Sequence, residues 1–103
     1  MITINQLKKI TKPVFEQNQI IKASLFGSYA RGTEDSKSDI DIFIVKNTKK
    51  RFLDRFEEFT ELYHLLNKYA VDLLIYSPEE LERNNHRPFI KTILAEGVAL
   101  YER

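Results

Sequence analysis

The sequence predicts an α/β (α+β) fold, a small mixed β-sheet with helices packed on it. Segments with helical periodicity alternate along the chain with short segments typical of strands, as expected when helices cover a sheet. The chain has 103 residues, so we expect one domain spanning residues 1–103. Hydrophobic residues make up 43% of the chain and charged residues 30%, a composition that argues against a disordered protein.

The first half of the chain is predicted to hold one helix and two strands. Apolar residues recur at helical spacing over residues 3–18, and Pro13 is expected to kink this helix or divide it in two. Residues 20–26 are apolar, partly β-branched and bounded by Gly27, which is typical of a buried strand. Residues 39–45 form the clearest strand, because isoleucine occupies every second position. The polar segment between these strands is expected to form a turn or short helix and then a loop.

The second half is predicted to continue the alternation of helices and strands. An apolar stripe indicates a helix over residues 49–69. The stripe consists of Phe52, Phe56, Phe59, Tyr63 and Leu66. Residues 71–76 form a strand, and residues 77–84 open with a serine, a proline and two acids, which is typical of a helix start. A last helix over residues 89–97 ends at its glycine, and residues 98–101 are expected to add an edge strand.

The charge of the chain is almost balanced. Sixteen Lys and Arg residues against fifteen Asp and Glu residues leave a formal net charge of +1, which gives no reason to expect nucleic-acid binding. One basic cluster follows the second strand and consists of Lys46, Lys49, Lys50 and Arg51. We interpret it as a solvated loop and helix start, and the alternative is a contact with a polyanion or a nucleotide phosphate.

Several classes of protein are excluded or disfavoured by what the sequence lacks. It has no cysteine, which excludes disulfides and thiolate zinc sites. No signal peptide is visible at its N-terminus, and no apolar stretch approaches the roughly 20 residues needed to cross a bilayer. We therefore expect a cytoplasmic protein.

Three aspartates carry the strongest indication of chemistry. Asp39 and Asp41 lie two positions apart in a predicted strand, so their carboxylates point to the same side, where they repel each other. A divalent cation relieves that repulsion, and Mg²⁺ prefers carboxylate oxygens; the alternative is a pair of solvated acids at a strand end. Asp72 lies in an otherwise apolar strand, and it reaches the same site if the two strands are neighbours. Otherwise it is an edge residue or pairs with a Lys or Arg.

A possible phosphate-binding turn precedes the aspartates. Gly27 ends a predicted strand and allows the backbone to approach a phosphate closely, while Ser28 adds a hydroxyl donor. Arg31 follows and is expected either to contact a phosphate or to form a salt bridge with Asp35 or Asp39. With the three acids, these residues provide the parts of a nucleotidyl-transfer site, in which two carboxylate-bound metal ions activate an attacking hydroxyl and stabilise the leaving pyrophosphate.

The combined motif resembles the signature of the DNA polymerase β-type nucleotidyltransferase superfamily, and more narrowly that of prokaryotic minimal nucleotidyltransferase (MNT) domains. That signature has Gly-Ser, a gap of ten residues and then Asp-x-Asp; here residues 29–38 fill the gap between Ser28 and Asp39. The third acid of the family falls on Asp72. Phe43 stands where the family often has a smaller aliphatic residue, a change expected to alter packing more than chemistry.

The resemblance implies a polymerase β-like fold and a specific activity. Many MNT proteins are antitoxins paired with an all-helical HEPN toxin that cleaves RNA, and they are understood to silence it by moving AMP from ATP onto its tyrosine hydroxyl. The cofactors expected from the resemblance are ATP and two Mg²⁺ ions, with Asp39, Asp41 and Asp72 as catalytic metal ligands and Gly27, Ser28 and Arg31 as nucleotide-binding residues. The expected partner is a HEPN-type toxin.

Two alternative functions remain open at this point. One is nucleotidyl transfer to a small molecule such as an aminoglycoside, although the short chain leaves little room for a substrate-binding element. The other is an antitoxin that acts by binding alone, although such a protein gains nothing from three clustered acids. The extension of nucleic-acid ends is less favoured than either.

Overall fold

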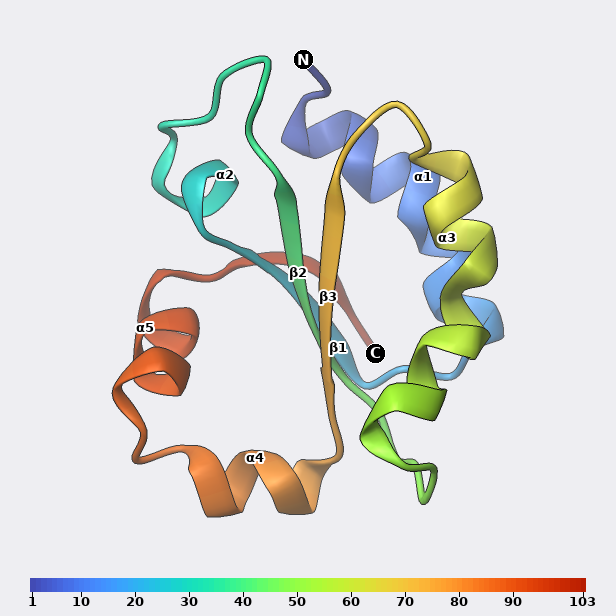
Figure 1. Cartoon of the computed structure of the whole chain (residues 1–103), viewed down its shortest axis with the longest axis vertical. Coiled ribbons are helices and arrows are strands. Elements are labelled where there is room, and N and C mark those ends of the chain that lie inside the picture. Colours follow the sequence, from blue (N-terminus) through green and yellow to red (C-terminus); the bar gives the residue numbers. More distant parts are fainter.

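The fold is built on a four-stranded mixed sheet in the order β3-β2-β1-β4 (Figure 1). The computed structural model describes all residues, 1–103. The strands are β1 (Lys22–Phe26), β2 (Ile40–Val45), β3 (Val71–Tyr76) and β4 (Val98–Glu102). β1 is antiparallel to both β2 and β4, whereas β2 and β3 are parallel. The predicted mixed sheet is confirmed, including its C-terminal edge strand.

The register of the sheet places the acidic residues side by side. In the parallel pair, Asp41 of β2 lies directly opposite Asp72 of β3. In the antiparallel pair, Phe26 of β1 lies opposite Asp41. A parallel pair needs a long crossover connection, which here consists of a 3₁₀ helix, η1 (Phe52–Phe59), and the helix α3 (Thr60–Leu65). This crossover brings β3, and with it Asp72, next to β2.

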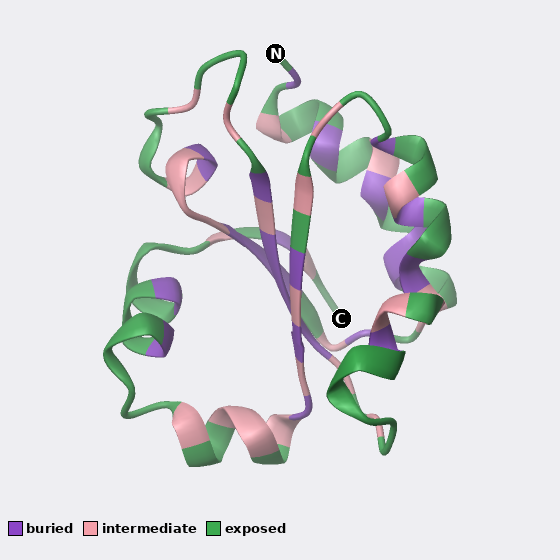
Figure 2. Ribbon diagram, in the orientation of Figure 1, coloured by how far each residue is buried: buried purple, intermediate pink, exposed green.

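One face of the sheet carries the main hydrophobic core. The helix α1 (Ile4–Gln17) packs there together with η1 and α3, and the core cluster contains 17 buried residues. Isoleucine at every second position of β2 points into this cluster, as its spacing predicts. Figure 2 shows the buried side of α1 turned toward the strands.

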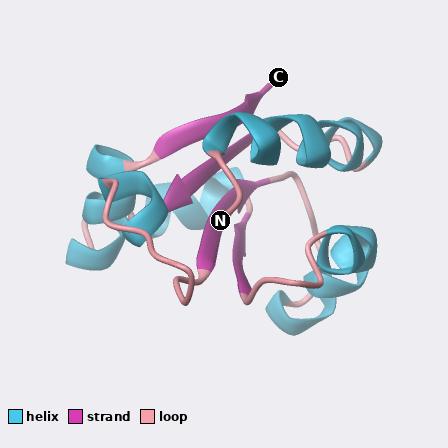
Figure 3. Cartoon of the chain, turned by 90° about the horizontal axis from the view of Figure 1, so that it is seen from above, coloured by secondary structure: helices cyan, strands magenta, loops and turns pink.

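The opposite face of the sheet is covered less completely. The helices α4 (Pro78–Asn84) and α5 (Pro88–Glu96) lie on it, and only four buried residues form its cluster: Phe43, Val45, Ile90 and Ile93. No residue of α4 is buried. Seen from above, helices lie on both sides of the strands (Figure 3). None of the helices combines the length and apolar character that crossing a membrane requires.

Pro13 lies inside the first helix and does not divide it in two. α1 is continuous from Ile4 to Gln17 and begins with a capping box between Thr3 and Gln6. Proline at this position removes only the hydrogen bond to the carbonyl of Lys9, four residues earlier. Both Pro13 and Lys9 are on the exposed side of α1, where water can satisfy that carbonyl.

The helix predicted over residues 49–69 is wrong in its extent and in part of its geometry. Its first part is the 3₁₀ helix η1 rather than an α-helix, and regular helix ends at Leu65. The predicted stripe is also only partly buried: Phe59 and Leu66 lie in the core, whereas Phe52 is 40% exposed. A 3₁₀ turn has three residues, so it aligns positions i and i+3 and turns the polar Arg55 toward the sheet.

Arg55 joins three segments at the C-terminal end of β3. Its guanidinium is buried and donates hydrogen bonds to the carbonyl oxygens of Lys50 and Ile75, at 3.0 and 2.9 Å, and to Oε1 of Glu80, at 2.7 Å. Burial alone raises the pKa of Glu80, but the hydrogen bonds from Arg55 and Ser77 outweigh burial and hold that pKa below its ordinary value. The crossover and the start of α4 are thus connected through one side chain.

We expect Arg55→Met to lower the free energy of unfolding by about 2 kcal/mol or more, because it leaves a carbonyl and a carboxylate without their buried donor. Urea unfolding at pH 7 measures the change. Arg51→Met is the matched control, since Arg51 is exposed, and it should alter stability by less than about 0.5 kcal/mol. Equal effects of the two substitutions would contradict the assigned role of Arg55.

Candidate active site

The three aspartates predicted from the sequence converge at one end of the sheet. Asp39 immediately precedes β2, and Asp41 and Asp72 are the second residues of β2 and β3. One carboxylate oxygen from each lies within 4.8 Å of the other two. Asp39 and Asp72 are exposed, and Asp41 is half-buried. The parallel pairing of β2 and β3 is what brings Asp72 into the group.

The donor set fits a magnesium ion. Oxygen ligands lie about 2.1 Å from Mg²⁺, so two of them are separated by no more than about 4.2 Å. The three carboxylate oxygens lie within 4.8 Å of one another, and exposed side chains can close any small difference by rotating. The arrangement can therefore hold a divalent cation with only small side-chain movements.

The electrostatics of the cluster favour a bound cation as well. Burial, followed by the negative charges of Asp72 and Asp39, raises the pKa of Asp41 to about 6, while the positive charge of Arg31 opposes the increase. Without a cation, ionising Asp41 therefore costs more free energy than ionising an ordinary aspartate. A divalent cation removes this cost, because it offsets the repulsion among the three acids.

Gly27 fixes the position of Asp41. Its backbone has φ 72° and ψ −149°, a conformation that only glycine adopts readily, and a Cβ atom there would clash with Oδ2 of Asp41. The carbonyl oxygen of Gly27 accepts hydrogen bonds from the N–H groups of Ala30 and Arg31, both at 3.1 Å. Ser28 then begins the four-residue helix α2 (Ser28–Arg31). The turn predicted to bind phosphate therefore lies directly against the acidic cluster.

Arg31 lies close to the cluster but does not form either of the salt bridges considered from the sequence. It pairs with Glu96, the last residue of α5, at 3.9 Å between Nη1 and Oε2. Asp35 is engaged within its own loop, where it accepts hydrogen bonds from Lys37 N–H at 2.8 Å and from the Ser38 hydroxyl at 3.3 Å. The expected pairing with Asp35 or Asp39 is wrong: Arg31 pairs with Glu96 instead, and Asp35 is hydrogen-bonded within its own loop.

The basic cluster of residues 46–51 lies at the other end of β2. Lys46 and Lys50 both pair with Glu58, and Lys46 follows the last residue of the strand. Lys46 is five residues beyond Asp41 along the chain, which corresponds to about 16 Å in a strand. The ion pairs with Glu58 support the interpretation as part of a loop and helix start, and the cluster lies at the end of β2 away from the three acids.

Three residues near the acidic cluster were not singled out by the sequence. Phe26 lies opposite Asp41, and its ring packs edge-on against Phe89 with 5.9 Å between centroids. Glu96 is the partner of Arg31. The position of Phe26 just before Gly27 could have indicated that it lies near the acids. Nothing in the local sequence indicated that Phe89 and Glu96 would reach this end of the sheet.

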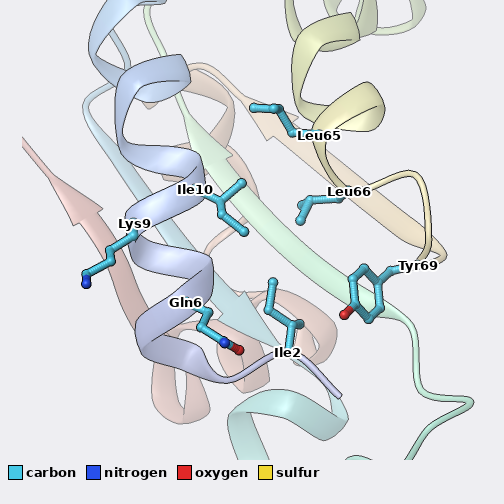
Figure 4. A pocket seen from close by; sticks show the side chains of 7 residues that line it. All are labelled: Ile2, Gln6, Lys9, Ile10, Leu65, Leu66 and Tyr69. Carbon is cyan, nitrogen blue, oxygen red and sulfur yellow. The ribbon is translucent and has the colours of Figure 1, made fainter.

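An apolar cavity on the other face of the sheet does not belong to this site. It has a volume of about 320 Å³ and lies between α1 and the end of α3, on the face of the sheet opposite α5. Figure 4 shows Ile2, Ile10 and Leu66 pointing into it, with the amino group of Lys9 directed away. None of the three aspartates lines this cavity.

Comparison with known families identifies the class of protein. The family model described as polymerase beta, nucleotidyltransferase matches residues 8–103. A protein of Methanocaldococcus jannaschii named "Putative protein adenylyltransferase MJ0435" is 36% identical over 98 residues, covering 94% of this chain and 97% of that protein. A second relative from that organism, of the same description and designated MJ1379, is 31% identical over 105 residues, covering 95% and 97% of the two chains. The chain belongs to the polymerase β-type nucleotidyltransferase family and is a nucleotidyltransferase.

Solved structures show the same fold. A toxin–antitoxin with AMP-PNP superposes with a TM-score of 0.70 at 23% identity, covering 93% of this chain and 73% of that chain. A minimal nucleotidyltransferase structure gives 0.68 at 22% identity, covering 94% and 95%. A complex of tri-AMPylated Shewanella oneidensis HEPN toxin with MNT antitoxin gives 0.65 at 19% identity, covering 98% and 74%. The predicted resemblance to minimal nucleotidyltransferases is confirmed at the level of the fold.

Asp41 should make the metal-free protein less stable as the pH rises. Its pKa is raised from an ordinary value of 3.8 to about 6 in the folded protein. The folded state therefore gains stability from protonated Asp41 below pH 4, and this stabilisation is lost as the pH rises through about 6. We expect Asp41→Asn to match wild type near pH 4 and to be more stable by about 1 kcal/mol at pH 7, after allowing for solvent screening of this half-exposed group. Urea unfolding in a chelator at several pH values measures the difference.

Adding Mg²⁺ at pH 7 should reverse the order of the two proteins, because only the wild type keeps all three ligands. A constant difference between them across the pH range would contradict the charge repulsion assigned to Asp41.

Gly27→Ala should be more damaging than Gly32→Ala. Both glycines have φ 72°, but a Cβ at Gly27 would meet Asp41, whereas one at Gly32 would meet nothing within 4 Å. We expect a loss of about 2 kcal/mol or more at Gly27 and about 1 kcal/mol at Gly32. Only the first substitution should also abolish stabilisation by Mg²⁺, which thermal unfolding with and without the ion detects. Retained Mg²⁺ stabilisation in Gly27→Ala would show that this glycine does not position Asp41.

Proposed function

We propose that this protein is a magnesium-dependent protein adenylyltransferase, which moves AMP from ATP onto a tyrosine hydroxyl of a HEPN-type helical partner and so acts as its antitoxin. The observation that carries the proposal is the convergence of Asp39, Asp41 and Asp72 beside the Gly27 turn, in a chain of the nucleotidyltransferase family. Relatives named as protein adenylyltransferases support AMP transfer to a protein. Structural neighbours described as HEPN toxin complexes support the choice of partner.

The roles of the residues follow from their positions around the turn. Asp39, Asp41 and Asp72 would hold two Mg²⁺ ions through their carboxylates, and Asp72 would also accept the proton of the acceptor hydroxyl. These ions, when bound, neutralise the triphosphate and lower the pKa of the acceptor hydroxyl. Gly27, Ser28 and Arg31 bind the β- and γ-phosphates of ATP.

The transfer itself is a single displacement at the α-phosphorus. A bond forms between the acceptor oxygen and that phosphorus, and the bond to the bridging oxygen of pyrophosphate breaks. The proton of the acceptor hydroxyl passes to Asp72, which is exposed and can release it to solvent. Pyrophosphate leaves from the side of Gly27 and Ser28.

The test is adenylylation of a HEPN-type helical protein supplied as the acceptor. Purified proteins are incubated with ATP and Mg²⁺, and mass spectrometry measures the gain of AMP units on the partner. We expect modification of a tyrosine that falls at least about 100-fold in Asp39→Asn, because metal binding is lost. Asp54→Asn is the matched control, since Asp54 is exposed on η1 and lies outside the cluster.

The other outcomes discriminate between the alternative functions. A stable complex with no modification would favour an antitoxin that acts by occupancy. Pyrophosphate release that depends on an added aminoglycoside, with no partner modification, would favour a small-molecule substrate. Full modification by Asp39→Asn would rule out the assigned site.

A further inference from the structure

One flank of α5 faces the turn that is proposed to bind phosphate. At the start of the helix, the ring of Phe89 packs edge-on against Phe26, the residue before Gly27. At its end, Glu96 pairs with Arg31, the last residue of α2. Positions seven apart lie on the same side of an α-helix, so the two contacts belong to one flank. That flank therefore forms a wall beside Gly27 and Ser28.

The backbone at the end of α5 is held against β1 independently of the ion pair. A Cβ atom on Gly97 would lie 2.6 Å from the carbonyl oxygen of Ile93 and 3.5 Å from both the carbonyl oxygen of Leu25 and Cβ of Ser24. The first of these contacts, within the end of the helix, is what requires glycine, whereas the two with β1 are ordinary van der Waals distances. Val98, the next residue, pairs with Leu25 in the sheet. Because Leu25 is two residues before Gly27, this pairing keeps Glu96 near the turn whether or not its carboxylate is paired.

The ion pair itself is weak and can be exchanged. The side chains of Arg31 and Glu96 are 50% and 45% exposed, and their closest atoms are 3.9 Å apart. Exposed pairs of this kind contribute little to stability. A guanidinium binds phosphate oxygens through two parallel hydrogen bonds, and a triphosphate carries several negative charges, so it can displace a single carboxylate from Arg31.

We propose that Glu96 is a positioning residue that competes with the triphosphate for Arg31. The inference rests on the proposed function in one respect, since it takes Arg31 as a phosphate ligand. In the free protein, Glu96 holds the guanidinium beside the turn. When nucleotide binds, Arg31 exchanges the carboxylate for phosphate oxygens, and Glu96 then opposes retention of the polyphosphate. Glu96 thus lowers the affinity for ATP and favours departure of pyrophosphate.

Calorimetric titration with AMP-PNP and Mg²⁺ tests this competition without any partner protein. We expect Glu96→Gln to bind the nucleotide about two- to five-fold more tightly than wild type, the range that an exposed ion pair can supply. In an Arg31→Gln background, the same change should leave the Kd unaltered, because the guanidinium for which Glu96 and the triphosphate compete is then absent. Glu82→Gln is the control for general charge, since Glu82 is an exposed acid on α4.

Each outcome decides a separate point. An unchanged or weaker Kd in Glu96→Gln overturns the competition, and so does equal tightening in the Arg31→Gln background, which would indicate bulk charge alone. A merely structural role for Glu96 predicts weaker binding and not tighter binding. Failure of wild type itself to bind AMP-PNP would instead reject the proposed function, whereas binding by wild type with no effect of Glu96 rejects this inference alone.

Discussion

Repulsion among three carboxylates at one end of a largely buried sheet is the constraint around which this protein is organised. Asp39 and Asp41 are brought together by the pleat of β2, and parallel pairing adds Asp72 from β3. Burial and the neighbouring charges raise the pKa of Asp41, so the arrangement is costly until a cation is bound. The extensive apolar core on the other face of the sheet stabilises the fold and offsets this cost.

The two faces of the sheet divide the tasks of stability and function. The face under α1 and α3 contains the large apolar cluster, whereas α4 and α5 leave the other face only partly covered. The acids lie at the end of this thinner side, within reach of groups on α2 and α5. Arg55 connects the crossover to the start of α4 at the opposite end of β3, so the parallel strand that carries Asp72 is fixed by buried hydrogen bonds.

Much of the site could be predicted from local sequence. The two-residue spacing of Asp39 and Asp41 determines that their side chains share one side of a strand, whatever the strand packs against. The glycine before Ser28 is required by a backbone conformation and by the approach of Asp41, and both constraints leave a residue type visible in the sequence. The parts predicted wrongly were the extent and geometry of the crossover helix, which begins as a 3₁₀ helix, and the pairing of Arg31 with Asp35 or Asp39. Both depend on which segments pack together, and local spacing does not determine that.

The sequence by itself determined the identity of the acids, the glycine turn and the order of helices and strands, because each depends on spacing within a few residues. The tertiary structure decided that β3 lies parallel to β2, that Arg31 pairs with Glu96, and that Phe89 packs against Phe26. These contacts join segments far apart in the chain, so they depend on how α5 and the crossover pack on the sheet. Local periodicity fixes the direction of a side chain, but only packing fixes its neighbour.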